Sequence, residues 1–211
     1  MFTVNKYDKK PKNLGTIECA VSEFFNYTYL PVKLTGSFDL NYENRLGVFD
    51  VLIGRACCDF IGDFGIDEYV AHNIYITAKN QYQRNGCGFN RPGWHSDGFG
   101  TPDISYIWSN KQPTIFNKGP FFLTEHDKVS MRQMEAQAHR KNNYKFENNT
   151  LLRMDQYSIH KVGKYEEGPR AFVKICFSKD IYALAGNSVN YELDYNLEYK
   201  ERQKERNIPQ S

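Results

Sequence analysis

The feature that most constrains the fold is a series of short β-type segments separated by glycine, proline and polar turn residues. The clearest segment is RAFVKICFS at residues 170–178, which is rich in β-branched and aromatic residues and has a turn on either side. Such residues fit the pleated surface of a sheet. Further segments of this kind lie at residues 69–82, 104–109, 113–116, 150–155 and 158–161.

Helical character is confined to two stretches. Residues 43–65 can supply a helix followed by a glycine-broken turn, and residues 130–143 form a second helical stretch in which Ser130 and Gln133 resemble a capping box. Many short strands with few long helices predict a mainly β domain with some α, arranged as a sandwich or barrel. A double-sheet jelly roll fits this pattern best.

Composition narrows the class of protein further. The chain has 211 residues, of which 40% are hydrophobic and 25% charged, as in a globular domain that buries a core without disulfides. The net charge of +2 hides an acidic excess over residues 38–70 and a basic excess over residues 128–164. A local basic excess can attract an anionic substrate, but the overall balance lacks the charge of a tight duplex binder.

The cysteines indicate a reducing compartment. Their number is odd and none has the spacing of a metal site or a CxxC pair; they are Cys19, Cys57, Cys58, Cys87 and Cys176. No signal peptide and no apolar run long enough to cross a bilayer stand out. We therefore expect a cytoplasmic protein with free thiols and no membrane partner.

A set of potential metal ligands lies in the second half of the chain. His95 and Asp97 are two residues apart, so on an extended segment both side chains point to one face. His160 begins a later β-type segment, and in a barrel strands that are distant in sequence can lie side by side. Two imidazoles and one carboxylate form the facial triad that holds non-haem Fe(II) with open coordination positions. We predict that these three residues bind a metal.

An arginine follows the second histidine. Arg170 opens the clearest predicted strand, ten residues after His160. A guanidinium near the metal can bind a carboxylate in bidentate fashion, so its position predicts an anionic co-substrate.

Taken together, these segments resemble a known signature. Trp94-His95-Ser96-Asp97, Tyr157-Ser158-Ile159-His160 and Pro169-Arg170-Ala171-Phe172-Val173-Lys174 resemble the HxD…H…R pattern of the Fe(II)/2-oxoglutarate-dependent oxygenases. The resemblance implies a double-stranded β-helix, a cupin-like jelly roll, as a catalytic domain over residues 70–197. Residues 1–69 would then be an extension packed on the barrel, residues 117–150 a basic, partly helical insertion and residues 198–211 a charged tail.

The resemblance also implies residue roles and a reaction. His95, Asp97 and His160 would bind Fe(II), and Arg170 would bind the 5-carboxylate of 2-oxoglutarate. Oxidative decarboxylation of 2-oxoglutarate to succinate would be coupled, with O₂, to hydroxylation of an organic substrate. A hydroxyl often adds to the carboxylate site, and Tyr106 is the favoured candidate, with Tyr82 and Tyr75 as others.

Two points depart from this scheme or extend it. Phe172 stands where several relatives carry a polar residue, which places the second carboxylate contact in question. Trp94 and Trp108 flank the predicted metal strand and either fill the core or stack on a planar, anionic substrate such as a nucleotide or nucleic acid.

A second class of function uses the same triad. A non-catalytic cupin-like module that binds or senses a metal needs the three ligands but no arginine for a carboxylate. Arg170 therefore favours the oxygenase. The basic insertion at residues 117–150 is either a substrate lid or a scaffold.

Overall fold

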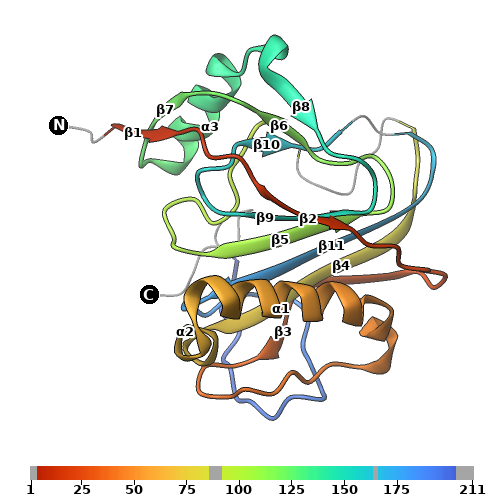
Figure 1. Ribbon diagram of the computed structural model, residues 1–211. Coiled ribbons are helices and arrows are strands. Elements are labelled where there is room, and N and C mark those ends of the chain that lie inside the picture. Colours follow the sequence, from red (N-terminus) through yellow and green to blue (C-terminus); the bar gives the residue numbers. More distant parts are fainter. Residues whose placement is uncertain (1–3, 86–91, 164–165, 203–211) are drawn as a thin grey trace.

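The structure is a computed structural model that describes residues 4–85, 92–163 and 166–202 (Figure 1). Its strands are β1 (Val4–Tyr7), β2 (Lys12–Thr16), β3 (Phe25–Lys33), β4 (Asn73–Gln83), β5 (Ile104–Ser109), β6 (Ile115–Asn117), β7 (Phe121–Thr124), β8 (Asn143–Lys145), β9 (Thr150–Met154), β10 (His160–Lys161) and β11 (Gly168–Ser178). Its α-helices are α1 (Asp50–Phe64), α2 (Ile66–Ala71) and α3 (Asp127–Gln137), with 3-10 turns at Asn44–Phe49 and Arg140–Asn142.

A six-stranded antiparallel sheet forms the centre of the molecule. Its strand order is β2-β9-β5-β11-β4-β3, so β11 lies inside the sheet and pairs with β5 on one side and β4 on the other. Strand β11 is the segment that the sequence marks most clearly as a strand. Its alternate residues therefore project to the two faces of the largest sheet.

The first face of this sheet carries the main apolar core. Ala171, Val173, Ile175 and Phe177 of β11 belong to a cluster of buried residues that also includes side chains of α1 and β3. Figure 1 shows α1 running along this face. The helix ends at Gly65, whose φ of 91° suits the residue that stops a helix.

Two smaller sheets lie on the other side. The strands β10, β6 and β8 form a three-stranded sheet, and an isolated bridge between His95 and His160 adds the segment around His95 beside β10. Strands β1 and β7 form a two-stranded sheet. Ile107 and Leu152 of the large sheet pack with Phe116 of the small sheet, so the sheets face each other as in a β-sandwich.

The insertion between β6 and β8 packs on these smaller sheets. Helix α3 covers the free edge of β7, because the Gln137 amide bonds both backbone groups of Phe122 and Gln133 accepts from the Thr124 N–H. The predicted capping box is wrong: α3 begins at Asp127, and the Ser130 N–H bonds the His126 carbonyl inside the helix.

The predicted fold class is confirmed at the coarse level, as a mainly β structure with antiparallel sheets. The helix predicted within residues 43–65 is present, whereas helix α2 and strands β1, β2, β3, β7 and β8 were not among the predicted elements. Among the described residues, no helix combines the length and apolar character needed to cross a bilayer. The cysteines described are free, namely Cys19, Cys57, Cys58 and Cys176, and Cys87, Lys164 and residues 203–211 lie outside the described part.

Candidate metal centre

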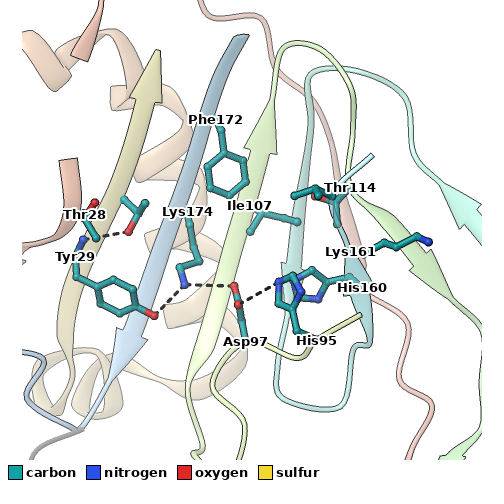
Figure 2. A pocket seen from close by; sticks show the side chains of 12 residues that line it. Thr28, Tyr29, His95, Asp97, Ile107, Thr114, His160, Lys161, Phe172 and Lys174 are labelled. Carbon is teal, nitrogen blue, oxygen red and sulfur yellow. Dashed lines mark hydrogen bonds and ion pairs between the residues drawn. The ribbon is translucent and has the colours of Figure 1, made fainter. Parts of the chain in front are cut away.

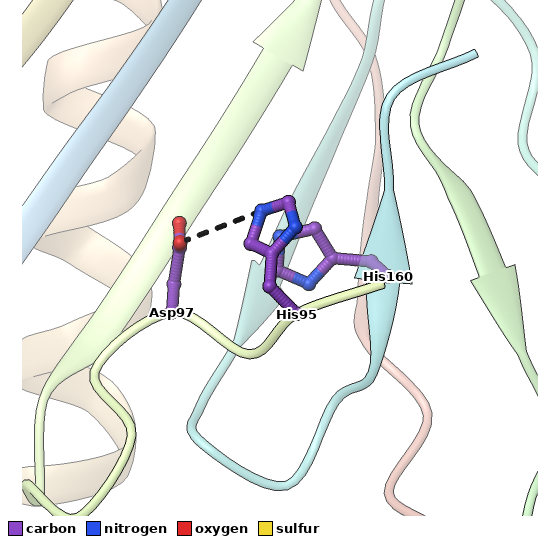
Figure 3. Close-up of side chains that lie close together, drawn as sticks. All are labelled: His95, Asp97 and His160. Atoms are coloured by element: carbon purple, nitrogen blue, oxygen red, sulfur yellow. Dashed lines mark ion pairs between the residues drawn. The ribbon is translucent and has the colours of Figure 1, made fainter. Parts of the chain in front are cut away.

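The two predicted histidine ligands face each other across a strand pair. The His95 N–H donates to the His160 carbonyl at 2.9 Å, and the His160 N–H donates back to the His95 carbonyl at 2.9 Å. Residues paired in this way have closely spaced Cβ atoms. The imidazole centroids consequently lie 4.5 Å apart, although the residues are far apart in sequence (Figure 3).

Backbone carbonyls orient both imidazoles. His95 Nδ1 lies 3.0 Å from the Gly93 carbonyl oxygen, and His160 Nδ1 lies 2.9 Å from the Ser158 carbonyl oxygen. A carbonyl can only accept, so each Nδ1 carries the proton and each Nε2 keeps its lone pair. This is the arrangement that prepares a neutral imidazole to bind a metal through Nε2.

Asp97 completes the group. It follows His95 by two residues, and its Oδ1 lies 4.0 Å from His95 Nε2. One ligand atom from each of His95, Asp97 and His160 lies within 4.8 Å of the others. Ligands at right angles around one ion at ~2.1 Å are roughly 3 Å apart, so small side-chain rotations bring the three onto a common ion. Two imidazoles and one carboxylate can hold a divalent metal ion, with no fourth side chain among the described residues of this group.

Lys174 forms an ion pair with the carboxylate ligand. Its Nζ lies 3.2 Å from Asp97 Oδ2 and 2.9 Å from the Tyr29 hydroxyl oxygen. Burial raises the pKa of the Asp97 carboxyl, but the charge and hydrogen bond of Lys174 act against burial, and the pKa is held well below its usual range. Burial lowers the pKa of Lys174, yet Asp97 and Tyr29 raise it above its usual value. Both groups are therefore charged at neutral pH.

The triad lines a cavity of about 170 Å³ between the two sheets, shown in Figure 2. A cavity of this size holds several water molecules or a small acid. The lining is set by strands β3, β4, β5, β10 and β11 and their connections, and comprises Thr28, Tyr29, Thr77, His95, Asp97, Ile107, Thr114, His160, Lys161, Val162, Phe172 and Lys174. Among the described residues of this lining, Asp97 is the one acidic residue.

The insertion supports the metal site from behind. Trp94 and Ile159, the residues before the two histidines, are buried in a cluster with Leu123 of β7 and Met134 of α3. The Trp94 N–H also donates to a Glu135 carboxylate oxygen at 3.4 Å. The insertion therefore packs against both segments that carry the histidines, which agrees with the scaffold alternative.

Arg170 lies on the same face of β11 as Lys174 but is not among the residues that line the cavity. It is buried, and it donates from Nε to the Lys111 carbonyl at 3.0 Å and from Nη2 to the Gln112 carbonyl at 3.2 Å. Its guanidinium carbon lies 5.5 Å from the centroid of the Phe172 ring, which does line the cavity. Arg170 thus stands one side chain behind the cavity and anchors the turn that leads to Thr114.

The structure does not bring Tyr106 to the site. Its side chain points to the opposite face of the sheet, is fully buried, and donates to Asp59 Oδ2 at 3.0 Å. The expected contact with a co-substrate carboxylate is corrected accordingly. Tyr82 is exposed and bonds Glu167, while Tyr75 is on the side of the site but packs beside Tyr29 and donates to the Asp180 carbonyl.

Neither tryptophan lines the cavity. Trp108 lies in the main core and donates from Nε1 to the Ile17 carbonyl at 2.8 Å. Trp94 is buried against the insertion, with the Lys161 ammonium 4.5 Å from its ring centroid. The tryptophans therefore give no reason to expect a planar substrate.

Sequence reasoning missed Lys174 and Tyr29 as site residues. A signal for Lys174 was present, because a lysine in the middle of an apolar strand, an even number of residues after Arg170, must share its face. The direction of the Tyr29 side chain depends on an irregularity in β3 that cannot be predicted from the sequence. The pairing register shifts between Tyr27 and Leu30, and Tyr29 has a φ of 47°.

Comparison with known proteins finds no matching protein-family model and no matching curated sequence.

Proposed function

We propose that the protein is a non-haem Fe(II)- and 2-oxoglutarate-dependent oxygenase that hydroxylates an organic substrate. The observation that carries the proposal is the convergence of two oriented Nε2 atoms and one carboxylate at an open cavity that also contains a buried lysine. Ferrous iron in such a site supplies oxidation of a substrate C–H bond by O₂, coupled to conversion of 2-oxoglutarate to succinate and CO₂.

The order of the strands supports a double-stranded β-helix. Along the chain, β4, β5, β9 and β11 belong to the large sheet, while the His95 segment, β6, β8 and β10 belong to the small sheet. The chain therefore crosses repeatedly between two facing sheets, as in a jelly roll. In this proposal β2 and β3, from residues 1–69, extend the large sheet at its two edges.

The charges of the cavity support an acidic co-substrate. Lys174 brings a buried positive charge to the lining, and the hydroxyls of Thr77 and Thr114 offer further donors, whereas the Lys161 ammonium lies over the Trp94 ring. Arg170 lies behind Phe172 at the same face. We propose that 2-oxoglutarate extends from the metal towards Phe172, with Arg170 and the turn that it anchors at the far end.

The residues of the site have separable roles in this proposal. The carbonyls of Gly93 and Ser158 fix the orientation of the two imidazoles, so that each Nε2 already faces the metal position. The cavity limits what reaches the metal to small molecules and projecting groups, because 170 Å³ cannot enclose a folded partner. The organic substrate therefore places its C–H bond at the open side of the cavity.

The test begins with anaerobic protein, Fe(II) and 2-oxoglutarate. A visible metal-to-ligand charge-transfer band should develop, and admission of O₂ should produce succinate. In His160→Ala the band and the succinate should both be lost. His139→Ala is the matched control, because His139 is exposed and outside the cavity, and it should behave as the wild type.

The same experiment separates the oxygenase from the cupin-like sensor. Folded wild-type protein that binds Fe(II) but gives neither the band nor succinate would overturn the oxygenase and leave a metal-binding module.

A further inference from the structure

We infer that Lys174 makes metal binding at the triad depend on an anion. Without an anion its ammonium holds Asp97, and with an anion bound it neutralises that anion beside the metal. The inference rests on the proposed function, since it concerns the same cavity, but it assigns a regulatory property to this chain's own lysine.

Lys174 and a metal ion at the triad would share one carboxylate, that of Asp97. Asp97 Oδ1 faces His95 Nε2 at 4.0 Å, and Asp97 Oδ2 accepts from Lys174 at 3.2 Å (Figure 2). Lys174 is 8% exposed, so little water screens its charge. A cation that enters between the imidazoles and Asp97 meets a buried ammonium on the other side of the same carboxylate.

A divalent metal ion in the cavity leaves an excess of positive charge. A divalent cation adds two positive charges to a lining in which Asp97 already balances Lys174. The partly buried centre then carries an excess of about two positive charges, and an unpaired charge that is poorly hydrated is costly. A dianion that binds beside the metal removes the excess and gives the ammonium a new partner. Metal and dianion should consequently bind with positive coupling.

The backbone of β3 fixes the second partner of Lys174. That partner, Tyr29, has a left-handed φ of 47° at the register shift of β3. The Tyr29 N–H donates to the Thr77 hydroxyl at 3.0 Å, and the adjoining Thr28 N–H donates to the Ser188 hydroxyl at 2.9 Å. Bulges and strained residues occur where a side chain must be aimed at a site. Here the bulge aims the Tyr29 hydroxyl at the ammonium.

The test measures metal affinity without turnover. Mn(II) is titrated into full-length protein, and free Mn(II) is followed by electron paramagnetic resonance, with and without saturating 2-oxoglutarate. In wild-type protein 2-oxoglutarate should tighten Mn(II) binding strongly. In Lys174→Gln, which keeps a hydrogen-bond donor but loses the charge, Mn(II) alone should bind about tenfold more tightly. The tightening by 2-oxoglutarate should shrink by a similar factor, because Mn(II) affinity rises without the anion and stays about the same with the anion bound.

Lys161→Met is the matched control. It removes one positive charge from the same lining, but Figure 2 shows the Lys161 side chain directed away from the triad, and its ammonium lies over Trp94. Its Mn(II) affinities should change less than twofold. Lys174→Met repeats the measurement with an apolar stem, and thermal unfolding identifies any variant that fails to fold.

The outcomes separate this inference from the proposed function. Undiminished coupling in both folded Lys174 variants, or an equal loss of coupling in Lys161→Met, would overturn the role of Lys174 and leave the metal site intact. Wild-type protein that binds no Mn(II) under either condition would instead overturn the proposed function itself.

Discussion

The two faces of strand β11 differ in chemistry although most residues on both faces are buried. On one face Ala171, Val173, Ile175 and Phe177 pack against α1 and its neighbours, and every one is apolar. On the other face the alternate residues are Arg170, Phe172, Lys174, Cys176 and Ser178, of which all but Phe172 are buried. A single strand thus serves the core and the candidate site.

The difference shows where function is to be sought. Burial of apolar residues is explained by stability alone, because it removes surface from water. Burial of an ammonium and a guanidinium opposes stability unless each is paired, so such groups point to a task. Substitutions on the two faces should therefore separate loss of stability from loss of ligand binding.

The largest effect is expected from Phe177→Ala on the core face. Phe177 is fully buried, and its ring stacks on Phe60 with centroids 4.3 Å apart. The cavity left behind should lower the free energy of unfolding by about 3–5 kcal/mol. Phe172→Ala, on the same strand but half-buried, should lower it by about 1–2 kcal/mol. Urea denaturation measures both, and equal losses would contradict the division between the faces.

The second-largest effect is expected at the candidate metal site. His95→Ala removes a metal ligand whose side chain is 14% exposed and makes no contribution to the main core. Mn(II) affinity should fall at least about 100-fold, while the free energy of unfolding changes by about 1 kcal/mol or less. Equilibrium dialysis with Mn(II) and urea denaturation of the same preparation give the two numbers. Retention of metal binding in folded His95→Ala would remove His95 from the site.

The sequence predicted the His95 and Asp97 part of the triad because the geometry of that pair is local. Asp97 and His95 are brought together by the two-residue period of an extended chain, and the chemistry of the three side chains names the site. The pairing that brings His160 opposite His95 is not local. It depends on backbone hydrogen bonds between segments separated by β5 through β9. The sequence could propose this contact from ligand chemistry but could not derive it.

Tyr106 shows that a strand can be predicted correctly while the face to which its side chains point is not. The strand over residues 104–109 was predicted correctly, but its face was not, because Tyr106 and Ile107 are both compatible with a core. Only pairing with β11 decides the matter: Tyr106 lies opposite Ile175 and Ile107 lies opposite Lys174. A register error of one residue exchanges the two faces. Tyr29 was beyond prediction for a related reason, since its direction depends on a bulge.

Arg170→Gln tests how far the site extends along β11. If Arg170 serves the far end of the 2-oxoglutarate site, the concentration of 2-oxoglutarate needed for half-maximal succinate formation should rise about tenfold, the value of one charge-assisted contact. Mn(II) affinity without 2-oxoglutarate should stay the same, in contrast to Lys174→Gln. An unchanged 2-oxoglutarate requirement would confine Arg170 to anchoring the turn at Lys111 and Gln112.

The smallest effect is expected from Tyr106→Phe, which sharpens the comparison from the other side of the sheet. The Tyr106 hydroxyl donates to Asp59, and this carboxylate also accepts from Arg153 at 2.7 Å and Lys12 at 2.7 Å. Because two cations remain on Asp59, loss of the hydroxyl should lower the free energy of unfolding by only about 1 kcal/mol. Affinities for Mn(II) and 2-oxoglutarate should match the wild type, because the removed oxygen lies across the sheet from the cavity. A weaker 2-oxoglutarate affinity in this variant would show that the two faces are coupled through β5 and β11, and that their separation into core and site is too simple.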